Sequence, residues 1–485
     1  MGFFDRFKTI ETNDSNNLSY LEYRLAAWLN SDHRSEMELS RRYYDGEQDI
    51  YGSVKTVIDS NGQPTPVNNV PNATLVINMF RKLVDQKVNY SLGKPIVIST
   101  ENEKYGLEVN KIFDKVMMMK LRDLCNEAVL GGIAFVYPYY DRRGEFQIKV
   151  FDSYEFMPIW MDEEHDELDC GVRVYDTEIY ENGKATIVKR AEVYTKNGID
   201  RYIIRGNKLV QDTTAPHQDY LKYGDDGYNW DRLPIIPFRY NANEIPLIRD
   251  VKELQDALNV AVSNMMNELE ASPGNSIFVI SNYDGEDLAS FRHNLATYRA
   301  VKVRTVDGVQ GKVDILKTEI DPTSYDATIK QLRRALIENG RGFDAKEERL
   351  DGDPNELNIN SAYVDLDLDT DELETEFQRG FEELKFFIDQ WLIHTGKGDF
   401  TEESLEFVFN RNIFINQSQR ITDCQMSASM ISRKTMLAHH PFVKNVEREL
   451  RQLEEDEAAE MEKMEQTFQI QDSNRTEPTT GGDGE

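Results

Sequence analysis

Residues 359–392 read INSAYVDLDLDTDELETEFQRGFEELKFFIDQWL, and two hydrophobic periods meet inside this stretch. In its first half, apolar residues alternate with aspartates from Val364 to Leu368, and this period of two predicts an extended segment. In its second half, apolar side chains recur every three or four residues, which predicts an amphipathic helix over about 370–394: Leu373, Phe377, Phe381, Leu384, Ile388 and Trp391. We therefore expect a strand that leads into a long helix within 363–410.

Asp369 is the expected N-cap of this helix. Its carboxylate is suited to accept hydrogen bonds from the first-turn amides, and Glu372 follows three residues later. Asp371 adds negative charge where the helix dipole is positive. On this interpretation only Asp365 and Asp367 form an exposed acidic face.

The same aspartates suggest a cation site, because Asp365, Asp367, Asp369 and Glu376 fall at positions 1, 3, 5 and 12 of a calcium loop. Position 6 requires Gly and is Thr370 here, and the residues before the loop are not helical in pattern. We therefore expect no bound metal and no cofactor. A divalent-metal-dependent phosphodiesterase that uses the carboxylates of 351–376 remains the alternative function, and a calcium-stabilised surface protein is a third.

The region before this stretch has the order helix, β-like insertion, helix. Apolar residues from Leu247 to Leu269 recur in steps of three and four, which predicts one helix over 246–273. Short β-like runs occupy 274–320, and a second helical pattern over 321–340 ends at Asn339-Gly340. The polar residues 341–362 that follow are expected to form a long loop.

The first half of the chain mixes helix and strand patterns. Residues 1–40 carry an amphipathic helix with Leu18, Leu21, Leu25 and Trp28 at helical spacing. Residues 41–245 contain two helical stretches and then short β-like runs, which predicts an α+β region. Within it, 61–72 is a polar loop with three prolines that exclude helix.

The C-terminal part is helical in pattern over 411–470. Residues 471–485 form a polar tail that we expect to be disordered.

The charge of the chain excludes the usual kind of DNA-binding domain. The 485 residues include 56 Lys and Arg against 87 Asp and Glu, a net charge of 56 − 87 = −31. A protein that grips phosphates is usually basic, but this balance suits a protein that lets DNA pass without holding it.

No apolar run approaches the roughly 20 residues of a membrane span. Walker, nucleophile-elbow and zinc-helix motifs are absent, so we expect an intracellular protein without catalysis.

Several segments, taken in order, resemble the portal (head-to-tail connector) proteins of tailed bacteriophages of the siphophage type. The match covers most of 40–455, and the most specific segment is the opening stretch, 359–392. The others are YYDGEQDIYG at 43–52, INMFRKLVDQKVNYSLGKPI at 77–96, NEAVLGGIAFVYPYYDRRGEF at 126–146 and RLPIIPFRYNANEIPLIRDVKELQDALN at 232–259.

The resemblance implies the portal fold, an α+β subunit that assembles as a ring, usually of twelve copies, around an axial channel for double-stranded DNA. The predicted parts would then be two stem helices (246–273 and 321–340), a clip (274–320), a tunnel loop (341–362), a wing (41–245 and 363–410) and a crown (411–470). Twelve copies of a −31 chain give an anionic assembly, which keeps phosphates from adhering to the channel wall.

The function that the resemblance implies is structural. The ring would sit at one capsid vertex of the virion, after assembly in the host cytoplasm, and DNA would be packaged and ejected through it. The implied partners are other copies of the chain, double-stranded DNA without sequence specificity, the large terminase, a head-completion or adaptor protein, and the major capsid and scaffolding proteins. No membrane is implied.

Two sets of side chains are candidates for these contacts. The channel-facing candidates lie on the second stem helix, the tunnel loop and its end: Lys330, Arg333, Arg334, Arg341, Lys346, Arg349, Asp351, Asp353, Asn355, Asn358 and Asn360. The basic ones are suited to weak, sequence-blind phosphate contacts, and solvated faces or salt bridges are the alternative for each. The candidates for partner binding in the clip are Lys302, Arg304 and Lys312.

Overall fold

The computed structural model describes residues 14–461, with gaps at 59–60, 68–70, 182, 272–276, 282–304 (apart from 293 and 297), 307–308, 311, 317–321, 345–355, 412–416, 428 and scattered positions in 440–460. The chain divides into two units. One comprises Met1–Asp344 and Tyr363–Asn412, and the other Ala345–Ala362 and Ile413–Glu485. None of the helices in the described ranges combines the length and apolar composition of a membrane span.

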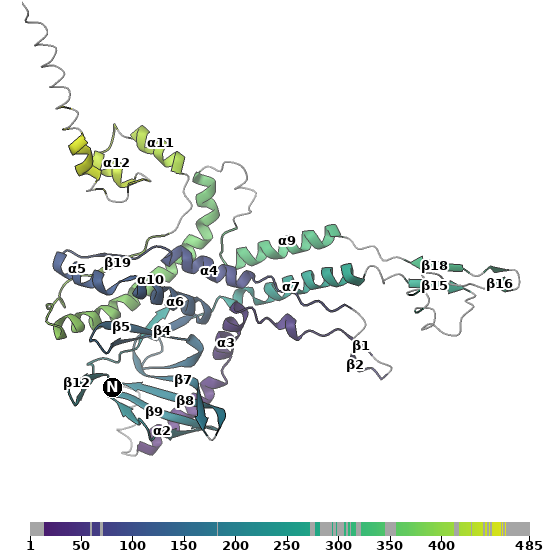
Figure 1. Ribbon diagram of the computed structural model, residues 1–485, viewed down its shortest axis with the longest axis horizontal. Coiled ribbons are helices and arrows are strands. Elements are labelled where there is room, and N and C mark those ends of the chain that lie inside the picture. Colours follow the sequence, from purple (N-terminus) through teal and green to yellow (C-terminus); the bar gives the residue numbers. More distant parts are fainter. Residues whose placement is uncertain are drawn as a thin grey trace, which may run out of the picture. The chain divides into compact units, whose positions relative to one another are not determined.

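A six-stranded antiparallel sheet forms one layer of the first unit (Figure 1). Its strand order is β10-β9-β8-β7-β6, with β11 also paired to β9. Helix α2 (Asp14–Leu29) covers this sheet, since Leu21 and Leu25 are buried with Val172 and Val193. The predicted early helix is therefore confirmed. The strands are β6 (Phe156–Trp160), β7 (Leu168–Glu181), β8 (Lys184–Thr195), β9 (Gly198–Arg205), β10 (Lys208–Gln211) and β11 (His217–Gln218).

A three-stranded antiparallel sheet of order β14-β4-β5 lies beside the helices. Its strands are β4 (Ile133–Tyr140), β5 (Phe146–Phe151) and β14 (Ile236–Arg239), so the predicted α+β character of this region is confirmed. Smaller pairs and turns complete the region: η1 (Asp49–Gly52), β1 (Thr56–Ile58), β2 (Pro64–Pro66), β3 (Val97–Ser99), η2 (Ser153–Glu155), β12 (Leu221–Tyr223), β13 (Asp226–Tyr228) and β19 (Glu406–Val408). The prediction of a polar loop over 61–72 is therefore wrong at residues 64–66, which form a strand paired with β1.

Five helices supply the main core of the first unit: α3 (Asp32–Tyr44), α4 (Met79–Leu92), α5 (Glu103–Ile112), α6 (Lys115–Gly131) and α10 (Glu356–His394). Their inner faces meet the three-stranded sheet. Phe238 of β14 contacts α10 so closely that a Cβ at Gly380 would lie 2.6 Å from its ring. The large side chains buried here are Phe80, Leu83, Leu124, Phe238, Phe377 and Phe381.

Two helices, α7 (Ile248–Ala271) and α9 (Pro322–Asn339), run side by side and carry a β module at one end (Figure 1). They confirm the helices predicted from the spacing of apolar residues. In the module, β15 (Ile277–Ser281) pairs antiparallel with β18 (Lys312–Leu316), and β16 (Thr305–Val306) pairs with β17 (Val309–Gln310). Most of the remaining 274–320 lies outside the described residues.

Helix α10 corrects the expectation made from the opening stretch. It begins at Glu356 and spans 39 residues, so the strand expected before 370 is wrong and the loop expected over 341–362 ends earlier. The apolar alternation was misleading because only Leu366 is buried, whereas Val364 and Leu368 are exposed. Leu366 and Leu373 are seven residues apart, which is a helical and not a strand repeat.

The second unit contains α11 (Gln417–Ser427) and α12 (Arg433–His439), which bury Cys424 and Leu437. These two helices agree with the helical pattern predicted there. The tail at 471–485 lies outside the described residues.

Candidate functional site

Four acidic residues of the opening stretch, Asp367, Asp369, Asp371 and Glu374, lie on α10 and form ion pairs with cations from other segments. Asp369 is buried in the middle of the helix, 4% exposed, and is not an N-cap. Its carboxylate accepts hydrogen bonds from Lys87 Nζ of α4 at 2.5 Å and from Tyr240 Oη at 2.8 Å. Because Lys87 is itself 1% exposed, this is a buried ion pair between two helices. Burial lowers the pKa of Lys87, and the charge of Asp369 opposes that shift.

A second cation, Arg411, is bound by three carboxylates on the same helix. Its guanidinium contacts Asp367 at 3.0 Å and Glu374 at 3.1 Å and also bonds to Asp371. Burial works against the charge, yet the hydrogen bonds with Glu374 and Asp371 raise the pKa of Arg411. The run of acids is therefore a set of ion pairs that hold the segment after β19 against α10.

Aromatic rings continue this set of contacts. Tyr90 Oη donates to Asp367, and burial together with that carboxylate raises the pKa of Tyr90. The Tyr90 ring stacks on Tyr363 at 5.6 Å, and Tyr363 stacks on Phe343 at 4.2 Å. We call the contacting residues the α10 junction: Lys87, Tyr90, Tyr240, Arg341, Phe343, Tyr363, Asp367, Asp369 and Arg411.

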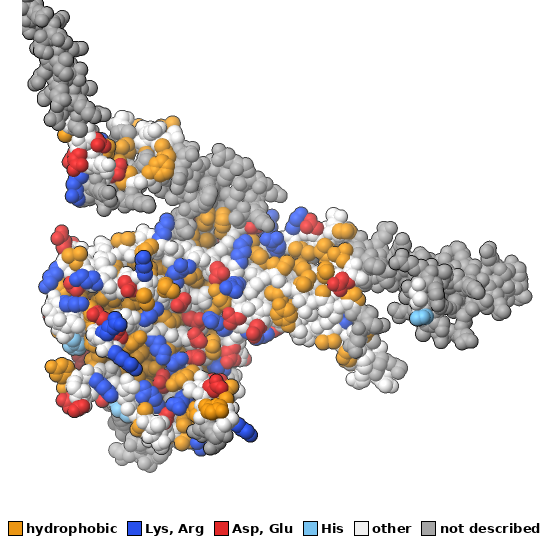
Figure 2. Space-filling view, viewed as in Figure 1, with side chains coloured by type: hydrophobic (Ala, Val, Ile, Leu, Met, Phe, Trp, Pro, Cys, Tyr) orange, Lys and Arg blue, Asp and Glu red, His pale blue; other side chains and the backbone are white. Residues whose placement is uncertain are grey.

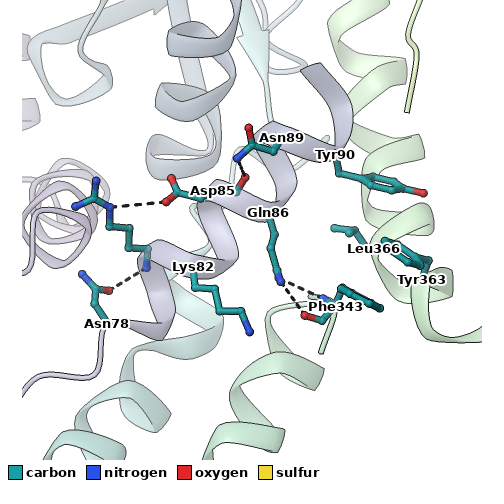
Figure 3. Close-up of a pocket in the computed structure, with 10 residues that line it drawn as sticks. Asn78, Lys82, Asp85, Gln86, Asn89, Tyr90, Phe343, Tyr363 and Leu366 are labelled. Atoms are coloured by element: carbon teal, nitrogen blue, oxygen red, sulfur yellow. Dashed lines mark hydrogen bonds and ion pairs between the residues drawn. The ribbon is translucent and has the colours of Figure 1, made fainter. Parts of the chain in front are cut away.

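The end of α9 enters the junction through a tight turn. Arg341 has φ 47°, its carbonyl accepts from Lys87 Nζ at 3.4 Å, and its guanidinium lies 3.4 Å from Asp369. A Cβ at Gly342 would lie 2.3 Å from the Leu83 side chain of α4, so any larger residue here would have to displace Leu83. Gln86 then fixes the next residue, because its amide nitrogen donates to the Phe343 carbonyl at 2.7 Å (Figure 3). The chain is thus held in place just before residue 345.

An open pocket of about 500 Å³ lies beside the junction, between α4 and the first described turns of α10 in the first unit (Figure 3). One wall consists of polar side chains of α4 and the other of stacked rings and Leu366. Its lining residues are Asn78, Arg81, Lys82, Asp85, Gln86, Asn89, Tyr90, Phe343, Tyr363 and Leu366. The pocket contains amides, charges and rings but no nucleophile beside a base, which fits a contact surface and gives no support to a reaction centre.

No three His, Cys, Asp or Glu side chains among the described residues are placed to hold a metal ion. The carboxylates of 367–374 face Lys and Arg, which fill the role that a cation would have. The phosphodiesterase and calcium alternatives therefore have no support in the described part of the chain.

Comparisons with known proteins agree with this structural role. A family model described as phage portal protein, SPP1 Gp6-like, matches residues 30–463. The chain belongs to this portal family. It is 26% identical over 425 residues to the portal protein of Bacillus phage SPP1, which covers 86% of this chain and 82% of that protein. It is 25% identical over 432 residues to the portal protein of Clostridium phage phiCD119, covering 85% and 91%.

Membership of the portal family confirms the family predicted from the sequence and makes this protein a structural part of a phage virion, the connector of head and tail, and not an enzyme. The α+β content of the first unit agrees with the predicted fold class.

The channel-facing candidates on α9 are placed by the structure in different environments. Lys330 pairs with Asp326 at 2.6 Å and Arg334 with Glu338 at 2.8 Å, both on exposed helix surface. Arg333 is half-buried. Arg341 is the member that the fold brings into the α10 junction.

The other candidates are placed less fully. Asn358 and Asn360 lie within α10, not in a loop, and Lys312 lies in β18. Outside the described residues lie Lys346, Arg349, Asp351, Asp353, Asn355, Lys302 and Arg304.

A second polar feature of this portal protein was missed from the sequence. Gln255, Asn259, Ser263 and Asn267 are buried on one face of α7, and we call them the α7 polar row. Their side-chain oxygens accept from backbone amides of the extended segment 73–77 and from the start of α4. The bonds are Ala73 to Asn267 (2.6 Å), Leu75 to Ser263 (2.9 Å), Ile77 to Asn259 (3.1 Å), and Met79 and Phe80 to Gln255 (3.0 Å each). The four-residue spacing of small polar side chains was the signal that could have revealed it.

Proposed function

We propose that this portal protein assembles as a ring of twelve copies around an axial channel, at one vertex of the capsid, and that double-stranded DNA is packaged and ejected through the channel. The observation that carries the proposal is the pair α7 and α9, which bears a β module at one end and leads at the other into the α10 junction. The helices touch along their length, and Tyr325 Oη donates to Glu268 at 2.7 Å between them. Because the chain belongs to the portal family, we interpret the two helices as a stem and the β module as a clip.

In this proposal α7 and α9 form the stem, the β module the clip, and the chain between α9 and α10 the tunnel loop. The six-stranded sheet with α4 to α6 and most of α10 forms the wing, and residues 411–470 the crown. The α10 junction fixes the chain on both sides of the tunnel loop, at Arg341 and Phe343 before it and at Tyr363 after it. A loop that contacts moving DNA needs such firm ends, because force on it must not unfold the helices beside it.

The channel needs a wall that does not hold DNA. At −31 per chain the ring is strongly anionic, and the exposed cations of α9 are already paired to acids. Any contact with phosphates is then weak and independent of sequence, made by Arg341 and by Lys346 and Arg349 of the tunnel loop. Asp351, Asp353 and Asn355 of the loop complete this lining, together with Asn358 and Asn360 in the first turns of α10.

The clip is the proposed docking surface for the large terminase and then for a head-completion or adaptor protein, with Lys302, Arg304 and Lys312 as contacts. The wing and crown would meet the major capsid and scaffolding proteins during assembly in the host cytoplasm.

Imaging of the purified protein by negative-stain electron microscopy, together with light scattering, tests the proposal. We expect rings with a mass about twelve times the 56.2 kDa chain. A stable monomer that cleaves DNA only with added divalent metal would overturn it.

The tunnel loop has its own test. Replacing 345–355 by a short Gly-Ser linker leaves Phe343 and the start of α10 in place, and should impair packaging or retention of DNA while rings still form. Loss of rings instead would show that this segment holds subunits together.

A further inference from the structure

The hairpin arm, made of η1, β1 and β2, stands away from the body of the first unit (Figure 1). Its two strands pair with each other and with no other described strand. A two-stranded hairpin is marginally stable in water unless it gains a further strand or a packed face. Yet β2 is exposed throughout, and Ile58 of β1 is 78% exposed. Tyr51 and Val54, which lead into β1, are exposed as well. The arm therefore has an uncovered apolar face in the single chain.

One edge of this hairpin is open to a further strand and the other is blocked. Thr56 lies opposite Pro66 and Ile58 opposite Pro64, and proline has no amide hydrogen to donate. Lys55 and Val67 form a hydrogen-bonded pair, since Val67 N donates to the Lys55 carbonyl at 2.9 Å. By alternation, the amides and carbonyls of Thr56 and Ile58 point outward from β2. The outer edge of β2 presents prolines instead and cannot pair as a strand.

A second open edge lies on the extended segment 73–77, whose backbone is hydrogen-bonded to the α7 polar row. Residues 73, 75 and 77 direct their amides to α7, so Thr74 and Val76 direct theirs to the opposite side. Neither Thr74 nor Val76 has a hydrogen-bond partner among the described residues. The side chains of Leu75 and Ile77 beside this edge are exposed. Figure 2 shows hydrophobic side chains gathered over α7 and α9.

We propose that the outer edge of β1 in one copy adds to the edge at Thr74 and Val76 of the neighbouring copy, with Ile58 covering the apolar side chains there. This inference rests on the proposed ring and names the surfaces that join its subunits. Both edges offer two outward-facing residues at the same two-residue spacing, which is what strand addition needs. The gain is a third strand for a hairpin that is marginal alone, and burial of exposed apolar area on both sides.

The pairing of the arm within its own chain favours a second copy as the partner. The inner edge of β1 is already bonded to the returning strand, β2 and Val67, which continues toward residue 73. Its outer edge therefore faces away from its own returning segment. A contact between two different surfaces of identical chains is heterologous, and repetition of such a contact gives a ring when the rotation between neighbours closes.

Disulfide trapping tests the contact directly in the full-length chain. The three native cysteines are all buried, so background oxidation should be low. Ile58→Cys is combined in turn with Thr74→Cys, Leu75→Cys or Val76→Cys, and the single variants serve as controls. We expect at least one double variant to give, on oxidation, a ladder of covalent multimers up to the full ring on a denaturing gel. Intramolecular disulfides alone, or intact rings without any cross-link, would overturn the proposal.

A charge substitution gives a second, independent measurement. Ile58→Asp should raise the protein concentration needed for half-maximal ring assembly by roughly tenfold or more, because it places a carboxylate in an apolar contact. Ile187→Asp is the matched control, since Ile187 is 72% exposed in the β7–β8 hairpin and outside the proposed contact. Equal assembly of Ile58→Asp and wild type would refute the contact while leaving the ring itself intact. A wild-type protein that forms no ring would instead refute the proposed function.

Discussion

Two long helices of this portal protein each carry a row of polar side chains that binds other segments, buried throughout on α7 and only at Asp369 on α10, and the rows work by different chemistry. On α7 the row consists of amide and hydroxyl side chains that accept hydrogen bonds from another segment's backbone. On α10 the row consists of carboxylates that bind Lys87 and Arg411. A neutral row costs less to bury and is insensitive to pH, whereas a charged row depends on each partner being present. The first suits a permanent seat for a strand, and the second ties together segments far apart in sequence.

The largest expected effect is on the charged row. Lys87→Met removes the buried cation of Asp369 and leaves only the exposed Arg341 guanidinium at 3.4 Å, which should lower the free energy of unfolding by about 3–5 kcal/mol. Chemical denaturation of the purified protein measures this. The control is Lys330→Met, which breaks an exposed pair with Asp326 and should cost less than about 1 kcal/mol. Similar losses in both variants would mean that burial of the pair has no energetic consequence.

The next effect concerns pH. Burial raises the pKa of Glu383, on α10, to about 7, against about 4.5 when unfolded. Between these values the folded state binds more protons than the unfolded state, so stability should fall as pH rises from about 4.5 to about 7. Glu383→Gln should remove up to about 3 kcal/mol of that fall.

Denaturation at pH 5 and pH 8 compares the two proteins. Glu127, whose pKa burial also raises to about 7, contributes a fall of the same sign, so some slope should persist in Glu383→Gln. A slope identical to wild type would show that Glu383 is solvated.

A smaller effect is expected on the neutral row. Gln255→Leu leaves the amides of Met79 and Phe80 without their acceptor and should cost about 2 kcal/mol. The loss should be the same at pH 5 and pH 8, because no member of the α7 polar row titrates. If the loss changed with pH, the α7 polar row would not be insensitive to pH as the comparison with α10 requires.

The smallest effect is expected at the rim of the α10 junction. Phe343→Ala removes the ring that stacks on Tyr363 and should cost about 1 kcal/mol. Thermal unfolding monitored by near-ultraviolet circular dichroism would register both the loss and the change around Tyr363. A loss as large as that of Lys87→Met would place the main anchor in the rings and not in the ion pair.

Patterns local in sequence predicted much of the fold. The repeat of three and four residues gave α7 and α9 almost to their ends, because both helices have a continuous apolar stripe. Short β-like runs likewise marked the two sheets.

The start of α10 was not predicted, because Asp369 occupies a core position that sequence rules reserve for apolar residues. Its cation, Lys87, lies 282 residues away, and only the folded chain brings the two together. The same holds for Arg411 and its three acids. The α7 polar row was missed for a related reason, since a stripe of amides reads as solvent-exposed surface until the segment that covers it is known.

The α7 polar row also acts as a ruler. Four residues of helix advance about 6.0 Å, and two residues of strand advance about 6.6 Å, so the two repeats stay nearly in step over the four rungs from Gln255 to Asn267. One step beyond either end the helix offers Val251 or Ala271, whose side chains have no atom that accepts a hydrogen bond. A shift of the segment by two residues along α7 would leave one backbone amide without a hydrogen-bond acceptor. The length of the row thus fixes residue 73 at one position along α7. The hairpin arm, which precedes residue 73 in the chain, can extend only from that point.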